Sequence, residues 1–284
     1  MPEQKTRTAT APSGAAPGSP ENPAARAAIE SAASAFARAG QAAQPWTVAA
    51  PSFVIPGTVR ENCAFLRSSF PEVGLLLFET QACLDYGPDD LPGPGEFPEL
   101  SFHAHLPLDL PWDAGLERME AVLAALLAKV AHLGPWGYVL HPPPPTVNLA
   151  DVARLFRGLG VDPARVLLEN TREQNLAGIW EQAARAGFSA CLDLGHLLAY
   201  DQADLLELPG LWTRTRLLHL NAPGRDGRHE SLARLDSRGR RALETMLARF
   251  APGGVTMLEV FDPGRLAESL NVLAETAGRI LEHP

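Results

Sequence analysis

The chain has 284 residues, of which 46% are hydrophobic and 20% are charged, so it can bury a sizeable core and cannot be disordered throughout. Its net charge of −9, with lysine only at Lys5 and Lys129, argues against a general DNA- or RNA-binding protein, because such binding needs basic side chains to neutralise phosphates. No apolar run reaches the roughly 18 residues of a membrane-spanning helix, and cysteines that lie far apart without a CxxC pair fit a reducing, cytoplasmic compartment.

The first 45 residues differ in composition from the rest of the chain. They are rich in alanine and proline, contain no leucine or valine, and have only Met1, Ile29 and Phe36 as larger apolar residues. Such a segment buries too little apolar area to offset the entropy lost on ordering. We therefore predict a flexible, disordered tail over residues 1–45, with at most a loose helix at 24–43. Its deletion is expected to leave the melting temperature and activity unchanged, and the catalytic domain is expected to span residues 46–284.

From residue 46 onward, short β-type runs alternate with longer stretches of helical spacing. Strands are predicted at residues 47–55, 73–80, 100–106, 137–141, 165–170, 189–194, 216–221 and 255–261. Helices are predicted at 59–67, 115–133, 148–159, 176–186, 237–250 and 263–281, and a loop or turn at the Pro- and Gly-rich segment 85–99. Eight such units predict a (β/α)8 TIM barrel. A doubly wound sheet is the alternative, but the chain lacks a GxGxxG turn after its first strand.

Chemically active side chains collect at the predicted strand ends. Six of the eight histidines lie there, namely His103, His105, His141, His196, His219 and His229, and so do the carboxylates Glu79, Glu169, Asp193 and Glu259. The C-terminal ends of the strands form the active-site face of a TIM barrel. Taken singly, each residue has a structural interpretation, such as a helix cap for Asp193. Together, the four carboxylates would be costly to bury at one end of the barrel unless cations neutralised them. A mixture of histidine and carboxylate ligands suits zinc, manganese or iron, whereas calcium and magnesium prefer oxygen ligands.

The order of these residues resembles a known superfamily. The segments "HPP" at His141, "LLENT" at Glu169, "DLGH" ending at His196, "HLN" at His219, "HES" at His229 and "MLEV" at Glu259 are similar to xylose-isomerase-like barrels, especially the apurinic-endonuclease branch, family 2. The resemblance implies two or three zinc-type ions, with Glu169 bridging two of them. The ligands it implies are His103, His141, Glu169, Asp193, His196, His219, His229 and Glu259.

Two positions depart from that pattern. His105 has no assigned counterpart and is kept as a further candidate ligand. Gly227 stands where the branch has an aspartate, and the nearest acid is Asp226. The ligand set of a third ion is therefore incomplete unless the loop shifts by one residue.

Several such cations would hold a phosphodiester and activate water for its hydrolysis. Isomerases of the superfamily use fewer histidine ligands, so the six histidines favour a hydrolase. Segments beginning "AAPSFVIPG", "EVGLLLFET" and "HAHLPLDLP" also resemble cobamide-remodelling phosphodiesterases, which implies a corrinoid substrate. The alternatives are an isomerase or epimerase of a sugar or sugar phosphate, an apurinic-site endonuclease, which the net charge disfavours, and a non-catalytic barrel with a structural metal.

Other residues at the same face have candidate supporting roles. Glu79 is a candidate catalytic carboxylate beside Glu169 and Glu259. The loop residues Arg172, Arg225 and Arg228 are candidates for holding a substrate phosphate. Asn221 follows His219 by two residues, which places it on the same face of the strand and makes it a candidate for orienting a ligand. His132 and His283 lie near helix ends, where we expect structural roles.

Overall fold

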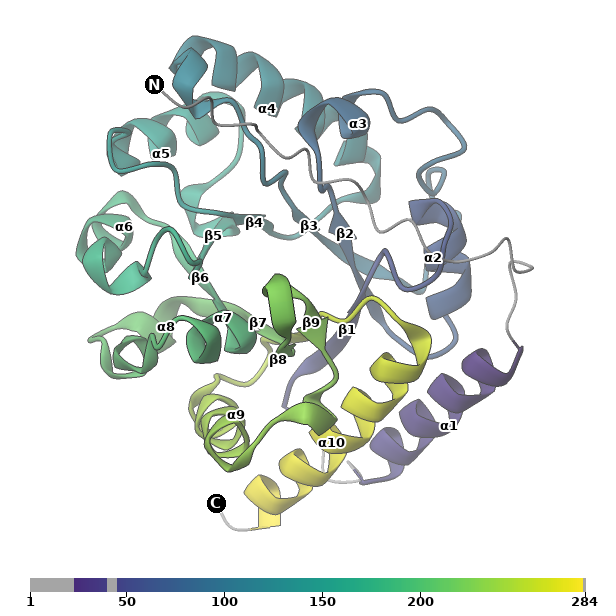
Figure 1. Ribbon diagram of the computed structural model, residues 1–284. Helices are drawn as coiled ribbons and strands as arrows, with labels where there is room; N and C mark the ends of the chain where they lie inside the picture. Colours follow the sequence, from purple (N-terminus) through teal and green to yellow (C-terminus); the bar gives the residue numbers. More distant parts are fainter. Residues whose placement is uncertain (1–22, 40–44, 283–284) are drawn as a thin grey trace, which may run out of the picture.

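Eight parallel strands close into a barrel around which the helices are arranged (Figure 1). The structure, a computed structural model, describes residues 23–39 and 45–282. Around the barrel the strands follow the order β1, β10, β7, β6, β5, β4, β3, β2. Their bounds are β1 Thr47–Pro51, β2 Glu72–Leu76, β3 Ser101–His105, β4 Tyr138–Leu140, β5 Val166–Glu169, β6 Ser189–Asp193, β7 Thr215–Leu220 and β10 Val255–Leu258. The prediction of a TIM barrel is confirmed, and each predicted strand overlaps one of these strands.

The helices lie on the outer face of the barrel. They are α2 Val59–Leu66, α3 Thr80–Leu84, α4 Leu116–Val130, α5 Leu149–Gly158, α6 Trp180–Ala186, α7 Leu194–Ala199, α8 Leu211–Arg214, α9 Ser237–Arg249 and α10 Pro263–Glu282. Short 3-10 turns lie at Trp112–Ala114, Ala131–Leu133, Pro163–Arg165, Leu176–Gly178, Ala203–Glu207, Arg225–Gly227 and Leu232–Arg234. The short helices α3, α7 and α8 were not predicted, because four to six residues are too few to show a helical period.

Alternating strand residues fill the barrel interior. Apolar side chains such as Ala49, Val139, Leu167, Leu217 and Met257 form one buried cluster there. A second, larger cluster joins the outward-facing strand residues to the helices. After β7, two short antiparallel strands of two residues each form a separate small sheet, β8 Ala222–Pro223 and β9 His229–Glu230. None of the helices in the described ranges combines the length and apolar character needed to cross a membrane.

An additional helix, α1 Pro23–Ala39, packs against α10 (Figure 1). Its buried residues Ile29, Ala32 and Phe36 recur at helical spacing and form one apolar face. The expectation of a flexible tail is therefore corrected for this stretch. Alanine has the highest helix propensity, and contact with α10 supplies the burial that the composition alone does not show. The rest of the predicted tail, residues 1–22 and 40–44, lies outside the described residues.

We expect the helix α1 to contribute to stability. Ala32→Asp places a carboxylate without a partner in the buried face of α1, and Ala28→Asp places the same group on the exposed face. Burying the new carboxylate in Ala32→Asp should lower the free energy of unfolding by about 2 kcal/mol. In a chain of this size, that loss lowers the melting temperature by about 4–8 °C. Thermal unfolding followed by circular dichroism measures the difference. Equal melting temperatures for the two variants would show that α1 adds no stability by packing.

Candidate metal centre at the barrel mouth

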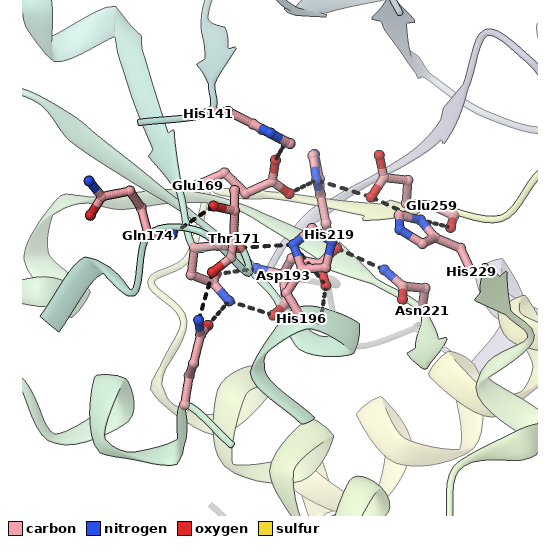
Figure 2. A network of polar contacts seen from close by, with 12 residues as sticks. His141, Glu169, Thr171, Gln174, Asp193, His196, His219, Asn221, His229 and Glu259 are labelled. Carbon is pink, nitrogen blue, oxygen red and sulfur yellow. Dashed lines mark hydrogen bonds and ion pairs between the residues drawn. The ribbon is translucent and has the colours of Figure 1, made fainter. Parts of the chain in front are cut away.

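Eight side chains from six barrel strands and the segments that follow them meet at the C-terminal end of the barrel. His105, Glu169, Asp193 and His219 lie in β3, β5, β6 and β7. The remaining four lie just after strands or in the segments that follow, and these are His141 after β4, His196 in α7, His229 in β9 and Glu259 after β10. Figure 2 shows seven of them converging, all but His105. Strand ends are close together in a barrel, so residues more than a hundred positions apart become neighbours.

Glu169 lies at the centre of this group. Its Oε2 atom lies 3.0 Å from Nε2 of His141 and 3.1 Å from Nε2 of His105, and its Oε1 atom lies 2.7 Å from Nδ1 of His219. Figure 2 shows the carboxylate between His141 and His219. Burial opposes ionisation of Glu169, but the charge of His219 and the hydrogen bonds from the three histidines outweigh it and hold the pKa well below its ordinary value. Glu169 is therefore ionised at neutral pH.

Five sets of donor atoms are close enough to share an ion, because the donor atoms of each set lie within 4.8 Å of one another. Two of them are His105, His219 and Glu259, and Glu169, Cys191 and His219. The other three, the principal ligand sets, together include all eight side chains; they are His105, His141 and Glu169; Glu169, Asp193, His219 and Glu259; and Asp193, His196 and His229. Glu169 links the first principal set to the second, and Asp193 links the second to the third. The arrangement is a chain of adjacent sites rather than a single site.

Hydrogen bonds from Nδ1 orient three of the histidines. Nδ1 of His105 lies 2.8 Å from the carbonyl oxygen of Leu106, Nδ1 of His196 lies 2.8 Å from that of Asn170, and Nδ1 of His229 lies 3.1 Å from that of Glu259. A carbonyl oxygen only accepts, so each Nδ1 carries a proton. Nε2 is then the atom that gives up its proton when a cation binds, and its lone pair faces the cluster. Proteins commonly orient histidine ligands to metals in this way.

The protonation preferences of the cluster fit a bound cation. Burial opposes a positive charge on His196, but the carboxylates of Asp193 and Glu169 outweigh it and raise the pKa to about 9. Burial likewise opposes ionisation of Glu259, but the charges of His219 and His229 lower the pKa to about 2. Oε2 of Glu259 is nevertheless buried without a hydrogen-bond partner. Carboxylates that attract protons onto nearby imidazoles attract a divalent cation in the same place, and the donor set of nitrogen and oxygen suits zinc-type ions.

Asp193 is held by the residues behind it. Nδ2 of Asn221 donates to Oδ2 of Asp193 at 2.8 Å, and the backbone N–H of His196 donates to Oδ1 at 2.6 Å. The Asn170 side chain bonds both backbone groups of Asp193. Gly195 is required here, because a Cβ at this position would lie 1.8 Å from Oδ1 of Asn221. Asn221 thus contacts a candidate ligand, as its position in the sequence predicted.

His103 does not belong to the cluster, which corrects the ligand set that the resemblance implied. His103 precedes His105 by two residues, so it points into the same barrel interior but one layer nearer the N-terminal end. Its Nδ1 atom lies 2.6 Å from Oε1 of Glu72, which also accepts a hydrogen bond from Trp136. No ligand set within the described ranges includes His103. His105 occupies the place that had been assigned to His103.

Two other candidates also lie away from the cluster. Glu79 is exposed and precedes α3, because β2 ends at Leu76 and the chain has already turned outward. Arg225 is exposed and lines neither pocket at the mouth. By contrast, Arg172 and Arg228 line a pocket there. The side chain of Asp226 lies outside the described part of the chain.

Arg265 was missed by the sequence analysis. It lines the larger pocket at the mouth, of about 520 Å³, and its Nη1 atom lies 3.2 Å from Oε2 of Glu230. Arg265 lies in the first turn of α10. The helical spacing of apolar residues predicts which face of α10 packs on the barrel, but it does not predict which polar side chains at the start of the helix line the pocket.

The fold is shared with solved structures of low sequence identity. No protein family and no characterised protein matches the chain by sequence. A D-tagatose 3-epimerase-like protein aligns with a TM-score of 0.61 and 15% identity over 83% of this chain and 98% of that chain. L-ribulose 3-epimerase aligns with a TM-score of 0.57 and 17% identity over 84% and 97%. The IolI protein with a bound zinc atom aligns with a TM-score of 0.54 and 13% identity over 83% and 96%.

At this level of identity the similarities show a shared barrel fold and no more. The three structures are named as epimerase or epimerase-like proteins and a zinc-binding protein, and none is named as a cobamide phosphodiesterase. The narrower resemblance to the corrinoid enzymes therefore gains no support from the comparisons.

Proposed function

We propose that the chain is a metal-dependent hydrolase that cleaves a phosphodiester in a small molecule. The observation that carries this proposal is the linkage of the three principal ligand sets through Glu169 and Asp193. Adjacent divalent ions suit phosphoryl displacement, because they stabilise the attacking and the leaving oxygens together. A one-ion enzyme needs only the donor atoms around His219, which would leave His141, His196 and His229 without a role as ligands.

The ligand sets would hold two or three ions of the zinc, manganese or iron type. When bound, such ions supply Lewis acidity and activate water near neutral pH. Glu169 and Asp193 each offer oxygens to two principal sets, so they hold the spacing between neighbouring sites. Glu259 stays ionised and lines the pocket, where it can accept a hydrogen bond from a water molecule. Arg228 lines this pocket and an adjoining smaller one, which Arg172 also lines, so these two arginines supply positive charge for phosphate oxygens.

An isomerase or epimerase acting on a sugar is the second candidate. The structural comparisons favour it over hydrolysis, because the similar structures include L-ribulose 3-epimerase and a D-allulose 3-epimerase from Methylomonas sp. in complex with D-allulose. The set of Glu169, Asp193, His219 and Glu259 also brings two glutamates to one site, as proton transfer between neighbouring carbons requires. The histidines outside that set, His141, His196 and His229 among them, favour the hydrolase, because they provide ligands for further ions.

The resemblance of three segments to cobamide-remodelling phosphodiesterases supports the nucleotide loop of a cobamide as the substrate. Abasic DNA remains the third candidate, and the net charge of −9 opposes it, because duplex binding relies on basic contacts to phosphates.

One experiment separates these candidates. The metal-loaded protein is incubated with a complete cobamide, with D-allulose and with an abasic DNA duplex, and the products are identified by mass spectrometry and sugar chromatography. We expect the cobamide to lose its lower nucleoside, and we expect EDTA or His196→Ala to abolish the reaction. His132→Ala is the matched control, because this histidine bonds the carbonyl of Pro92 and lies outside the ligand sets. Epimerisation of the sugar with an intact cobamide would establish the second candidate instead.

A further inference from the structure

Two pockets of different character open on the barrel mouth. The larger measures about 520 Å³ and the smaller about 350 Å³. Both are lined by His196, Gly227, Arg228 and His229, so they meet beside the third principal ligand set. We call the larger pocket the apolar lobe, because one of its walls is aromatic, and the smaller pocket the polar lobe, because two arginines line it.

The lining of the apolar lobe combines candidate ligands, among them His105, His141, Glu169 and Glu259, with a wall of aromatic rings. Phe78, Leu108 and Phe261 line the lobe, together with two leucines of the β2 end. The ring of Phe53 meets Phe78 edge-on at 5.3 Å, Phe78 meets Phe261 at 5.9 Å, and Phe261 stacks on His229 at 5.4 Å. The wall therefore runs without a break from the rim to a candidate metal ligand.

The rim of this wall exposes large apolar side chains to solvent. Phe53 is 43% exposed and Leu108 is 55% exposed. Leu108 lines the apolar lobe, and Phe53 lies just outside its lining, against Phe78. Among the described residues, only Leu116 is a third large hydrophobic side chain with comparable exposure, and it neither lines a lobe nor belongs to the aromatic wall. Apolar exposure concentrated beside a polar centre is typical of a surface that a ligand covers.

The polar lobe is lined mainly by polar side chains and glycines. Arg172, Tyr200 and Arg228 line it, and neither arginine forms an ion pair within the described ranges. Gly227 has a φ of +74°, and a Cβ there would meet nothing within 4 Å. The absence of a side chain at Gly227 leaves the junction between the lobes open.

We infer that the substrate has two parts of different character: a planar, uncharged ring system that packs on Phe53, Phe78 and Phe261, and an anionic part that enters the polar lobe. The bond that reacts then lies at the junction, beside His196 and His229. Only the identity of that bond rests on the proposed hydrolase function. The position of the ring follows from the two lobes themselves.

The test compares two phosphates that differ by a planar ring. Adenosine 5′-phosphate and ribose 5-phosphate are titrated calorimetrically into metal-loaded protein. We expect the adenosine compound to bind about tenfold more tightly, as stacking of a base on aromatic side chains provides. Phe53→Ala should remove most of that difference and leave ribose 5-phosphate binding unchanged. Leu116→Ala is the matched control, because it truncates an exposed apolar side chain that lines neither lobe and does not belong to the aromatic wall.

Equal affinities of the wild-type protein for the two phosphates would overturn the inference, as would an equal loss of both in Phe53→Ala. Neither result depends on hydrolysis, because neither probe contains a phosphodiester. Discrimination between the probes that depends on Phe53, in a protein that cleaves no diester, would support the ring subsite and reject the hydrolase.

Discussion

Glu169→Gln is expected to remove most of the bound metal and to lower the activity by at least about 100-fold. The substitution keeps the shape of the side chain but removes a buried negative charge that faces three histidines and belongs to two principal ligand sets. An amide oxygen binds a divalent cation more weakly than a carboxylate does. Elemental analysis of metal-loaded protein should find at least two ions in the wild type and a clear loss in the variant.

Two further glutamates provide a graded comparison. Glu259 belongs to fewer ligand sets than Glu169, so Glu259→Gln should lose less metal. Glu207 is ion-paired with Arg249 on the surface, and Glu207→Gln should retain the full content. If wild-type protein binds one ion or none, the multi-metal hydrolase is rejected. If Glu169→Gln retains all its ions, the linking role of this carboxylate is rejected.

The sequence was sufficient to predict the barrel, because strand and helix patterns alternate in a regular order. It was insufficient for the helix α1, whose stability comes from contact with α10 at the other end of the chain. Composition describes a segment by itself, whereas burial of Ile29 and Phe36 depends on a partner more than 200 residues away. The strand predicted at 73–80 also ran too far, as far as Glu79 and Thr80, because the apolar residues Leu77 and Phe78 continue the strand pattern past Leu76, where β2 ends.

The assignment at His103 and His105 failed for a geometric reason. The two residues are two positions apart in β3, so both side chains point into the barrel. The alternation of side chains along a strand shows which face a residue lies on, but not how deep it lies along the barrel axis. Depth depends on the register of β3 against β2, where His103 pairs with Gly74 and His105 with Leu76. Substituting each histidine in turn tests this difference.

His103→Ala is expected to destabilise the protein while leaving its metal content unchanged. Burial lowers the pKa of His103, so the neutral ring donates Nδ1–H to the buried carboxylate of Glu72. Breaking a buried pair by removing one partner costs about 3–5 kcal/mol. The melting temperature should therefore fall by about 6–20 °C for a chain of this size. Thermal unfolding in EDTA measures this change without any contribution from bound metal.

His105→Ala should have the converse effect, because its Nε2 atom faces Glu169 and the other residues of the mouth rather than a structural partner. We expect a loss of metal on elemental analysis and a smaller change in the melting temperature in EDTA. If His103→Ala loses metal and His105→Ala retains it, the resemblance assigned the ligand correctly and the depth of β3 in the barrel is wrong.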